Sequence, residues 1–237
     1  MNNEEGNPMS DKTTADAEKI WLKRIRIFIG ILGAILPWIA LLGTFIVGHA
    51  NPGIFSKEFW AMYSISETYY LTPPLVGVLT TASIILMCYK GYELKDHVVT
   101  TITGVFGILI VIFPCNCPYV TDETLVGFFQ LPAKISHIFH CISAVAFFVL
   151  LAYNSMFLFT KTYDGKEKEI TPQKKTRNTI YKICAIGMTS ALALMVIPFQ
   201  FTAKTFMVEA IALTFFGVSW LVKGDLFSFL ADKDKKS

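Results

Sequence analysis

Charged side chains are scarce in this 237-residue chain: Asp, Glu, Lys and Arg together make up 16% of it, whereas 53% of its residues are hydrophobic. A typical soluble domain carries about 25% charged residues. The mean hydropathy is also positive. This composition excludes an ordinary soluble globular protein and indicates a membrane protein.

The common catalytic and nucleotide-binding motifs are absent as well. The sequence contains no G-x-S-x-G, P-loop, Rossmann glycine fingerprint or H-E-x-x-H. It also has no basic patch interleaved with aromatics, which excludes nucleic acid as an expected partner. These absences favour a non-catalytic protein whose partners are membrane lipids and possible small molecules.

Apolar runs dominate what is present, and they lack the two-residue alternation of a transmembrane barrel strand. A helix needs about 20 mostly apolar residues to cross the hydrocarbon core. Small residues inside such runs let membrane helices approach closely, and glycine recurs within several of them. The sequence therefore predicts an all-α integral membrane bundle of six transmembrane helices. The predicted runs are Ile25–Val47, Thr72–Tyr89, Val98–Phe113, Ile138–Thr160, Thr179–Phe201 and Phe206–Val222, the third and sixth being short.

The basic residues orient this bundle. With six crossings, eighteen of the 21 Lys and Arg residues fall on one side, and only Lys57, Lys134 and Lys204 fall on the other. By the positive-inside rule, both termini are expected in the cytoplasm of a cell-membrane protein.

The ends of the chain are polar. Residues 1–20 are expected to form a disordered cytoplasmic tail, and residues 21–226 are expected to form the transmembrane domain. Residues 227–237 are expected to form a charged cytoplasmic tail. A signal peptide is the alternative interpretation of the first run. The length of the run favours a retained anchor instead.

An acidic residue lies at the outer boundary of the second run, in "YSISETYYLTPP". Ser64 and Glu67 have the S-x-x-E spacing of a helix capping box. Pro73 and Pro74 suggest that this capped turn is a separate interfacial element. Nearby aromatics are typical of the headgroup level. A second interpretation makes Glu67 an ionisable group in an outward-facing binding site.

The fourth run carries polar residues along one helical stripe. His137, His140, Ala144, Leu151 and the deeper Asn154 follow spacings of three, four and seven, so we expect them to face the bundle interior. Ordinary hydrogen bonding is the simplest role for this stripe. Alternatively, His137 and His140 hold zinc or another metal, with a carboxylate or with Cys115 and Cys117 as further ligands.

Glu209 has two interpretations. In the first turns of the sixth run, a carboxylate is favoured by the helix dipole. It also fits a polar pocket formed with Glu67 and the histidines, because a carboxylate in an apolar run is costly unless it has a function. The predicted ligand-binding residues are Glu67, His137, His140, Asn154 and Glu209.

Several short pieces carry a resemblance: "SISETYY", "CYKGYELKD", "HCISAVAFFVLLAYNSMFLF", "RNTIYKICAIG" and "EAIALTFFGVSWLVKGD". Over residues 30–225 the chain resembles a family of small, uncharacterised, mostly bacterial polytopic membrane proteins. The resemblance implies a shared fold and location but no activity. The Cys115–Cys117 pair lies outside the family pattern. The resemblance suggests that these positions matter: Glu67, Tyr92, Asp96, His137 or His140, Arg177, Asn178, Glu209, Trp220 and Lys223.

The chain also has a more distant resemblance to the alkaline ceramidase and adiponectin receptor superfamily, whose members are zinc-dependent membrane hydrolases with seven helices. Three hypotheses follow. The first is a non-catalytic protein with an outward-facing polar cavity that binds a lipid headgroup or small molecule. The second is a metal-dependent lipid hydrolase in which Glu67 or Glu209 handles protons. The third is a carrier or channel.

Overall fold

The computed structural model of the chain describes residues 8–50, 64–118, 120–161, 170–198 and 203–230. Six α-helices make up most of this structure: α1 (Pro8–Ala50), α2 (Pro74–Cys88), α3 (Leu94–Ile112), α4 (Ala133–Tyr153), α5 (Pro172–Val196) and α6 (Lys204–Lys223). Three single-turn elements accompany them: η1 (Ser66–Tyr70), η2 (Asn154–Leu158), which continues α4 as a π-helical turn, and η3 (Ser228–Leu230). Strands β1 (Leu125–Val126) and β2 (Leu131–Pro132) form a short antiparallel hairpin.

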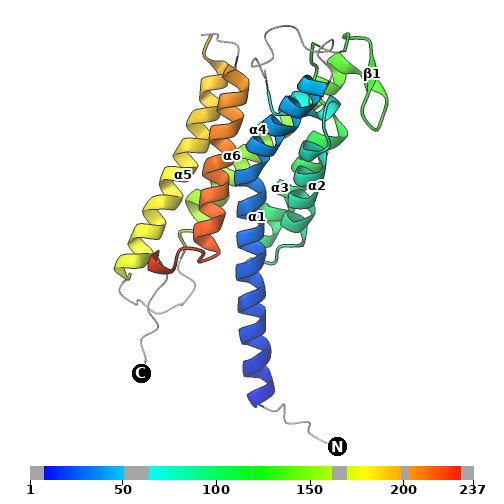
Figure 1. Ribbon diagram of the computed structural model, residues 1–237. Helices are drawn as coiled ribbons and strands as arrows, with labels where there is room; N and C mark the ends of the chain where they lie inside the picture. The colour runs from blue at the N-terminus through cyan, green and yellow to red at the C-terminus, as the bar shows by residue number, and fades with distance from the viewer. Residues whose placement is uncertain (1–7, 51–63, 119, 162–169, 199–202, 231–237) are drawn as a thin grey trace, which may run out of the picture.

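The six helices form a closed ring in chain order. Each packs against the helices before and after it, and α6 closes the ring against α1 (Figure 1). The β1–β2 hairpin and η1 lie at one end of the ring, which we call the hairpin end (Figure 1). The first turns of α1, the α2–α3 connection and η3 lie at the opposite end (Figure 1).

Five helices are long and apolar enough to cross a membrane: α1, α3, α5, α6, and α4 together with η2. The remaining helix, α2, has 15 residues and is therefore about 22 Å long. The prediction that the third and sixth runs are the short ones is wrong. Leu94 starts α3 earlier than predicted, because Glu93 and Asp96 form a capping box there.

Parts of both predicted tails belong to helical elements. Residues 8–20 belong to α1, where Ala, Glu and Lys favour the helix and Asp16 pairs with Lys19 at 3.5 Å. At the other terminus, η3 packs against the start of α5. Arg177 of α5 donates a hydrogen bond from Nη1 to the carbonyl oxygen of Leu230, which is buried. Residues 1–7 and 231–237 of the predicted tails lie outside the described residues.

Large side chains fill the centre of the ring, and apolar side chains also cover its outside. Trp220, Tyr181 and Phe216 are almost fully buried. Large exposed apolar residues, among them Trp38 and Ile142, cover the outward faces, as expected of helices that meet lipid. Glycine allows the close approach of α1 and α6, since a Cβ at Gly217 would lie 2.8 Å from the backbone nitrogen of Ala34.

Candidate functional site

Glu67 lies in η1, a single turn placed by the residues on either side of it. The Ser64 hydroxyl accepts a hydrogen bond from the Glu67 backbone N–H at 3.1 Å, which confirms one half of the predicted capping box. Pro74 then occupies the first turn of α2, so η1 is a separate element, as predicted. None of the described residues donates a hydrogen bond to the Glu67 carboxylate, which remains available for other contacts. Of the predicted interfacial aromatics, Phe55, Phe59, Trp60 and Tyr63 lie outside the described residues.

A chain of hydrogen bonds connects three separate elements at the hairpin end. On α6, the Glu209 carboxylate accepts from the Ile65 backbone N–H and, at 3.0 Å, from the Ser66 hydroxyl. The same hydroxyl lies 3.1 Å from Nε2 of His140 on α4. Nδ1 of His140 lies 2.9 Å from the Phe113 carbonyl oxygen. We call this arrangement the Glu209–Ser66–His140 network.

When both Ser66 contacts are hydrogen bonds, hydrogen counting gives the network one shared proton. A carbonyl oxygen only accepts, so Nδ1 of His140 must carry a hydrogen to bond Phe113. The single Ser66 hydrogen cannot point toward both Nε2 and Glu209. Either His140 is doubly protonated and Glu209 is a carboxylate, or His140 is neutral and Glu209 is protonated. Each arrangement contains one proton more than the state in which Glu209 is a carboxylate and His140 is neutral.

The site is acidic and partly open to solvent. Ser66, Glu67 and Glu209 are partly buried, whereas His140 is only 6% exposed. Burial, with a smaller contribution from Glu209, raises the pKa of the Glu67 carboxyl to about 7. No Lys or Arg among the described residues lies within ion-pair distance of Glu67 or Glu209.

The structure brings together three of the five predicted site residues and separates the other two. Glu67, His140 and Glu209 lie at the hairpin end, where Glu67 and Glu209 interact electrostatically. His137 is exposed near the start of α4, and its Nδ1 accepts from the Asn116 N–H at 3.2 Å, so it does not continue the buried stripe. Asn154 is buried in η2, fourteen residues and therefore about 21 Å beyond His140 along the helix.

The predicted metal ligands do not converge with a third ligand. Among the residues that the structure describes, no group of three or more His, Cys, Asp or Glu side chains is placed to hold a metal ion. Both ring nitrogens of His140 already face protein partners. Cys115 and Cys117 are buried and form no disulfide, and burial raises the pKa of the Cys115 thiol away from the thiolate that binds metals. Metal binding by His137 and His140 stays a prediction.

The sequence did not single out Ser66, whose hydroxyl connects the predicted site residues His140 and Glu209. Its only sequence signal is its place directly before Glu67 in "SISETYY". A hydroxyl that precedes a carboxylate in a turn is common, and the partners of Ser66 come from α4 and α6, 74 and 143 positions away along the chain. The contact therefore depends on how the helices pack.

Comparisons of the chain with protein-family models, with curated proteins and with solved structures found no match.

Proposed function

We propose that this chain is a non-catalytic membrane protein with six spans and cytoplasmic termini, whose hairpin-end site binds an ammonium group outside the membrane. The group belongs to a lipid headgroup or to a small molecule, and Glu67, Glu209 and Ser66 contact it. The observation that carries the proposal is the Glu209–Ser66–His140 network, which places a polar, proton-holding group at the edge of an apolar bundle.

The charge of the site supports a cationic ligand. Glu67 and Glu209 interact electrostatically, and no described Lys or Arg lies within ion-pair distance of either carboxyl group. Tyr69 and Tyr70 in the same turn form an edge-to-face pair with centroids 5.1 Å apart. Aromatic faces beside carboxylates are the usual environment for ammonium and quaternary ammonium groups.

A bound ammonium would displace protons from the site. With a pKa of about 7, the Glu67 carboxyl is about half protonated at neutral pH. A cation beside it favours the carboxylate, so binding releases a proton. Ligand affinity then rises with pH between about 6 and 8.

The test is binding of soluble short-chain lipids to detergent-purified protein. We expect dihexanoyl phosphatidylethanolamine or choline to raise the thermal midpoint of the wild type, and dihexanoyl phosphatidylglycerol to have no such effect at this site. Calorimetry in buffers of different ionisation enthalpy should show proton release. Glu209→Gln and Glu67→Gln should each weaken binding about tenfold, as expected for a lost charged contact.

Two matched variants serve as controls. Glu123→Gln removes an exposed carboxylate at the same end, and His137→Ala removes an exposed imidazole from the same helix as His140. Both should bind as the wild type does. Equal shifts with all three lipids, or unchanged binding in Glu67→Gln and Glu209→Gln, would contradict the proposal.

A further inference from the structure

The tip of the β1–β2 hairpin carries apolar side chains that the rest of the fold leaves uncovered. Phe128 is 80% exposed and Phe129 is 57% exposed, and their rings form an edge-to-face pair with centroids 5.2 Å apart. Leu125, on the adjoining strand, is 58% exposed. Apolar side chains that gather in this way on a surface mark a contact with a membrane or with another protein.

The tip packs against the end of a helix that is long and apolar enough to cross a membrane. The backbone N–H of Phe128 donates to the carbonyl oxygen of Ile112, the last residue of α3, at 3.4 Å. Glycine permits this approach, because Gly127 has a φ of 70° and a Cβ there would lie 2.6 Å from the same oxygen. Figure 1 shows the hairpin projecting sideways from this end of the ring. The tip therefore lies level with the end of a spanning helix, where the hydrocarbon core of a bilayer meets the headgroups.

The exposed aromatics continue onto the outward face of α4. Phe113, which follows α3, stacks on Phe129 with centroids 5.6 Å apart and on Phe139 with centroids 5.0 Å apart. Phe139 lies about two turns inside α4 and is itself exposed, together with Ile135 and Ile142 on the same face. The hairpin tip and the outward side of α4 thus form one apolar surface, so lipid that covers α4 also reaches the hairpin.

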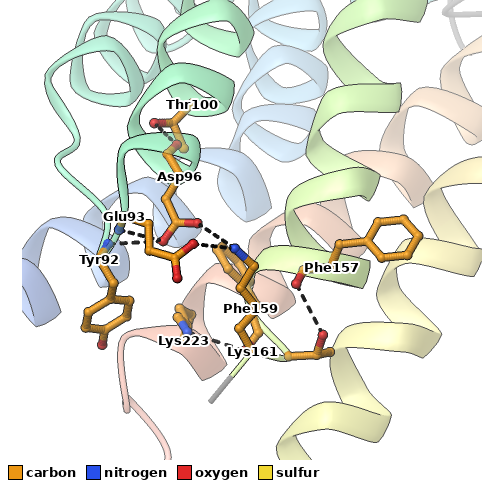
Figure 2. Close-up of polar contacts among 9 residues, drawn as sticks. Tyr92, Glu93, Asp96, Thr100, Phe157, Phe159, Lys161 and Lys223 are labelled. Atoms are coloured by element: carbon orange, nitrogen blue, oxygen red, sulfur yellow. Dashed lines mark hydrogen bonds and ion pairs between the residues drawn. The ribbon is translucent and has the colours of Figure 1, made fainter. Parts of the chain in front are cut away.

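The tip has no charge, in contrast to a connection at the opposite end of the ring. Residues 125–131, with the sequence LVGFFQL, contain no charged side chain. In the α2–α3 connection, Glu93 caps α3 and its carboxylate lies 2.7 Å from Nζ of Lys161 (Figure 2). Connections that meet water usually carry polar groups of this kind. At the hairpin they flank the tip, as the exposed Glu123 and Lys134.

We propose that the β1–β2 hairpin is a membrane-surface anchor, in which Phe128 and Phe129 insert at the boundary between the headgroups and the acyl chains. Aromatic side chains concentrate at this level of a bilayer. Burial of their apolar area in the boundary stabilises the inserted position. The inference rests on the membrane location proposed above and does not depend on the ammonium ligand.

Phe113 connects this hairpin anchor with the hairpin-end site. Its ring stacks on Phe129, and its carbonyl oxygen lies 2.9 Å from Nδ1 of His140. One residue thus contacts both the anchor and the Glu209–Ser66–His140 network. The anchor therefore holds this network at the depth of the lipid headgroups.

The experiment measures the depth of nitroxide spin labels on the full chain in phosphatidylcholine vesicles. Oxygen concentrates in the bilayer and a nickel chelate stays in water, so the ratio of their collision rates with the label reports its depth. Cys88→Ala and Cys141→Ala remove the two exposed thiols, and this background, whose other cysteines are buried, should take up no label. The hairpin is then labelled at Leu125→Cys, which keeps both aromatics, or at Phe128→Cys.

Two further labels calibrate the ratio. Ile142→Cys on the outward face of α4 is the lipid reference, and Glu123→Cys is the water reference. Both hairpin labels should give an oxygen-to-nickel ratio between those of the two references. Phe128→Asp with Phe129→Asp should shift the Leu125→Cys ratio to the water reference, because a carboxylate does not insert. Phe128→Leu with Phe129→Leu should leave it unchanged, because leucine inserts as well.

Three results would overturn the hairpin anchor. The first is a ratio at both hairpin labels equal to that of Glu123→Cys, since the tip would then lie in water. The second is an unchanged ratio in the double Asp variant. The third is dipolar broadening at Phe128→Cys that disappears on dilution with unlabelled protein, which would mean that a second copy covers the tip. A water-like ratio at Ile142→Cys would instead overturn the membrane location itself, so the two failures are distinguishable.

Discussion

Ser66 joins the hairpin-end site at the scale of single residues, because its one hydroxyl lies between an imidazole and a carboxyl group. It contacts Glu209 at 3.0 Å and His140 at 3.1 Å. Since a hydroxyl donates one hydrogen, the pair on either side must hold one additional proton. Protonation of this site is therefore a property of the three residues together and belongs to none of them alone.

Ser66→Ala should uncouple the two groups that the hydroxyl joins. His140 Nε2 and Glu209 Oε1 each lose a hydrogen-bond partner in a largely apolar environment. We expect a loss of about 1–3 kcal/mol of stability, measured as a lower thermal midpoint of the purified protein. Ser66→Thr keeps the hydroxyl and should lose less.

A double-mutant cycle separates this network from general damage. In the cycle of Ser66→Ala with Glu209→Gln, coupled residues should give non-additive losses. Strictly additive losses would mean that the hydroxyl and the carboxyl act independently, contrary to a shared proton.

Glu67→Gln should change how stability depends on pH. Burial raises the pKa of this carboxyl from 4.5 to about 7, so the folded protein binds the proton more tightly than the unfolded chain does. The stabilisation from this proton is fully present below about pH 4.5 and is lost as pH rises toward 7. Glu67 is partly exposed, and after solvent screening we expect an effect on the order of 1 kcal/mol.

The measurement is the thermal midpoint of both proteins from pH 4.5 to 8. The wild-type midpoint should fall over this range, and the Gln variant should show a smaller fall. The dependence that persists in the variant belongs to other groups of the protein, which include Glu209 and His140 of the neighbouring network. Parallel curves would show that Glu67 titrates normally.

At the scale of elements, the contact between α1 and α6 depends on missing side chains. A Cβ at Gly217 would lie 2.8 Å from both the Ala34 nitrogen and the Gly30 oxygen. Backbone atoms cannot move aside as a flexible side chain can. Gly217→Ala must therefore separate the two helices that close the ring.

Gly217→Ala should cost about 1–3 kcal/mol, the usual range for overpacking. Gly77 in α2 is the matched control, because a Cβ there meets nothing within 4 Å. Gly77→Ala should be neutral or stabilising by up to about 1 kcal/mol, since alanine is the better helix former. The two thermal midpoints should move in opposite directions, and equal shifts would mean that α1 and α6 are not in close contact.

The sequence predicts the elements better than their ends. Six apolar runs correspond to six helices, because burial in lipid requires long apolar segments with paired backbones. Their boundaries depend on local capping: Glu93 and Asp96 begin α3, whereas extended backbone at Tyr89 ends α2. The predicted pairing of Ser64 with Glu67 is local as well, and its first half is confirmed.

At the scale of the whole molecule, helix packing decides which polar residues meet. Glu67, His140 and Glu209 meet because η1, α4 and α6 share one end of the ring, and no local pattern contains that order. The approach of Lys174 and Lys223 to the carbonyl oxygen of Phe159 has the same origin. His137 lies about one turn before His140 on α4, but it is exposed and its partner is Asn116.

The charges at the two ends of the ring predict which side of the membrane each end faces. The cations Arg26, Lys174 and Lys223 share one end, and the acidic site occupies the other. By the positive-inside rule, we expect the cation-rich end to face the cytoplasm. Lys175 and Glu123 are exposed residues near the two ends, on α5 and before β1 respectively, and are suitable positions for labelling.

In a background with all five native cysteines replaced, a membrane-impermeant maleimide applied to intact cells should label Glu123→Cys. Lys175→Cys should react only after permeabilisation, because the bilayer separates it from the reagent. The opposite pattern would reverse the orientation and place the cation-rich end outside. Labelling of both positions in intact cells would mean that the two ends of the ring lie on the same side, which no crossing bundle allows.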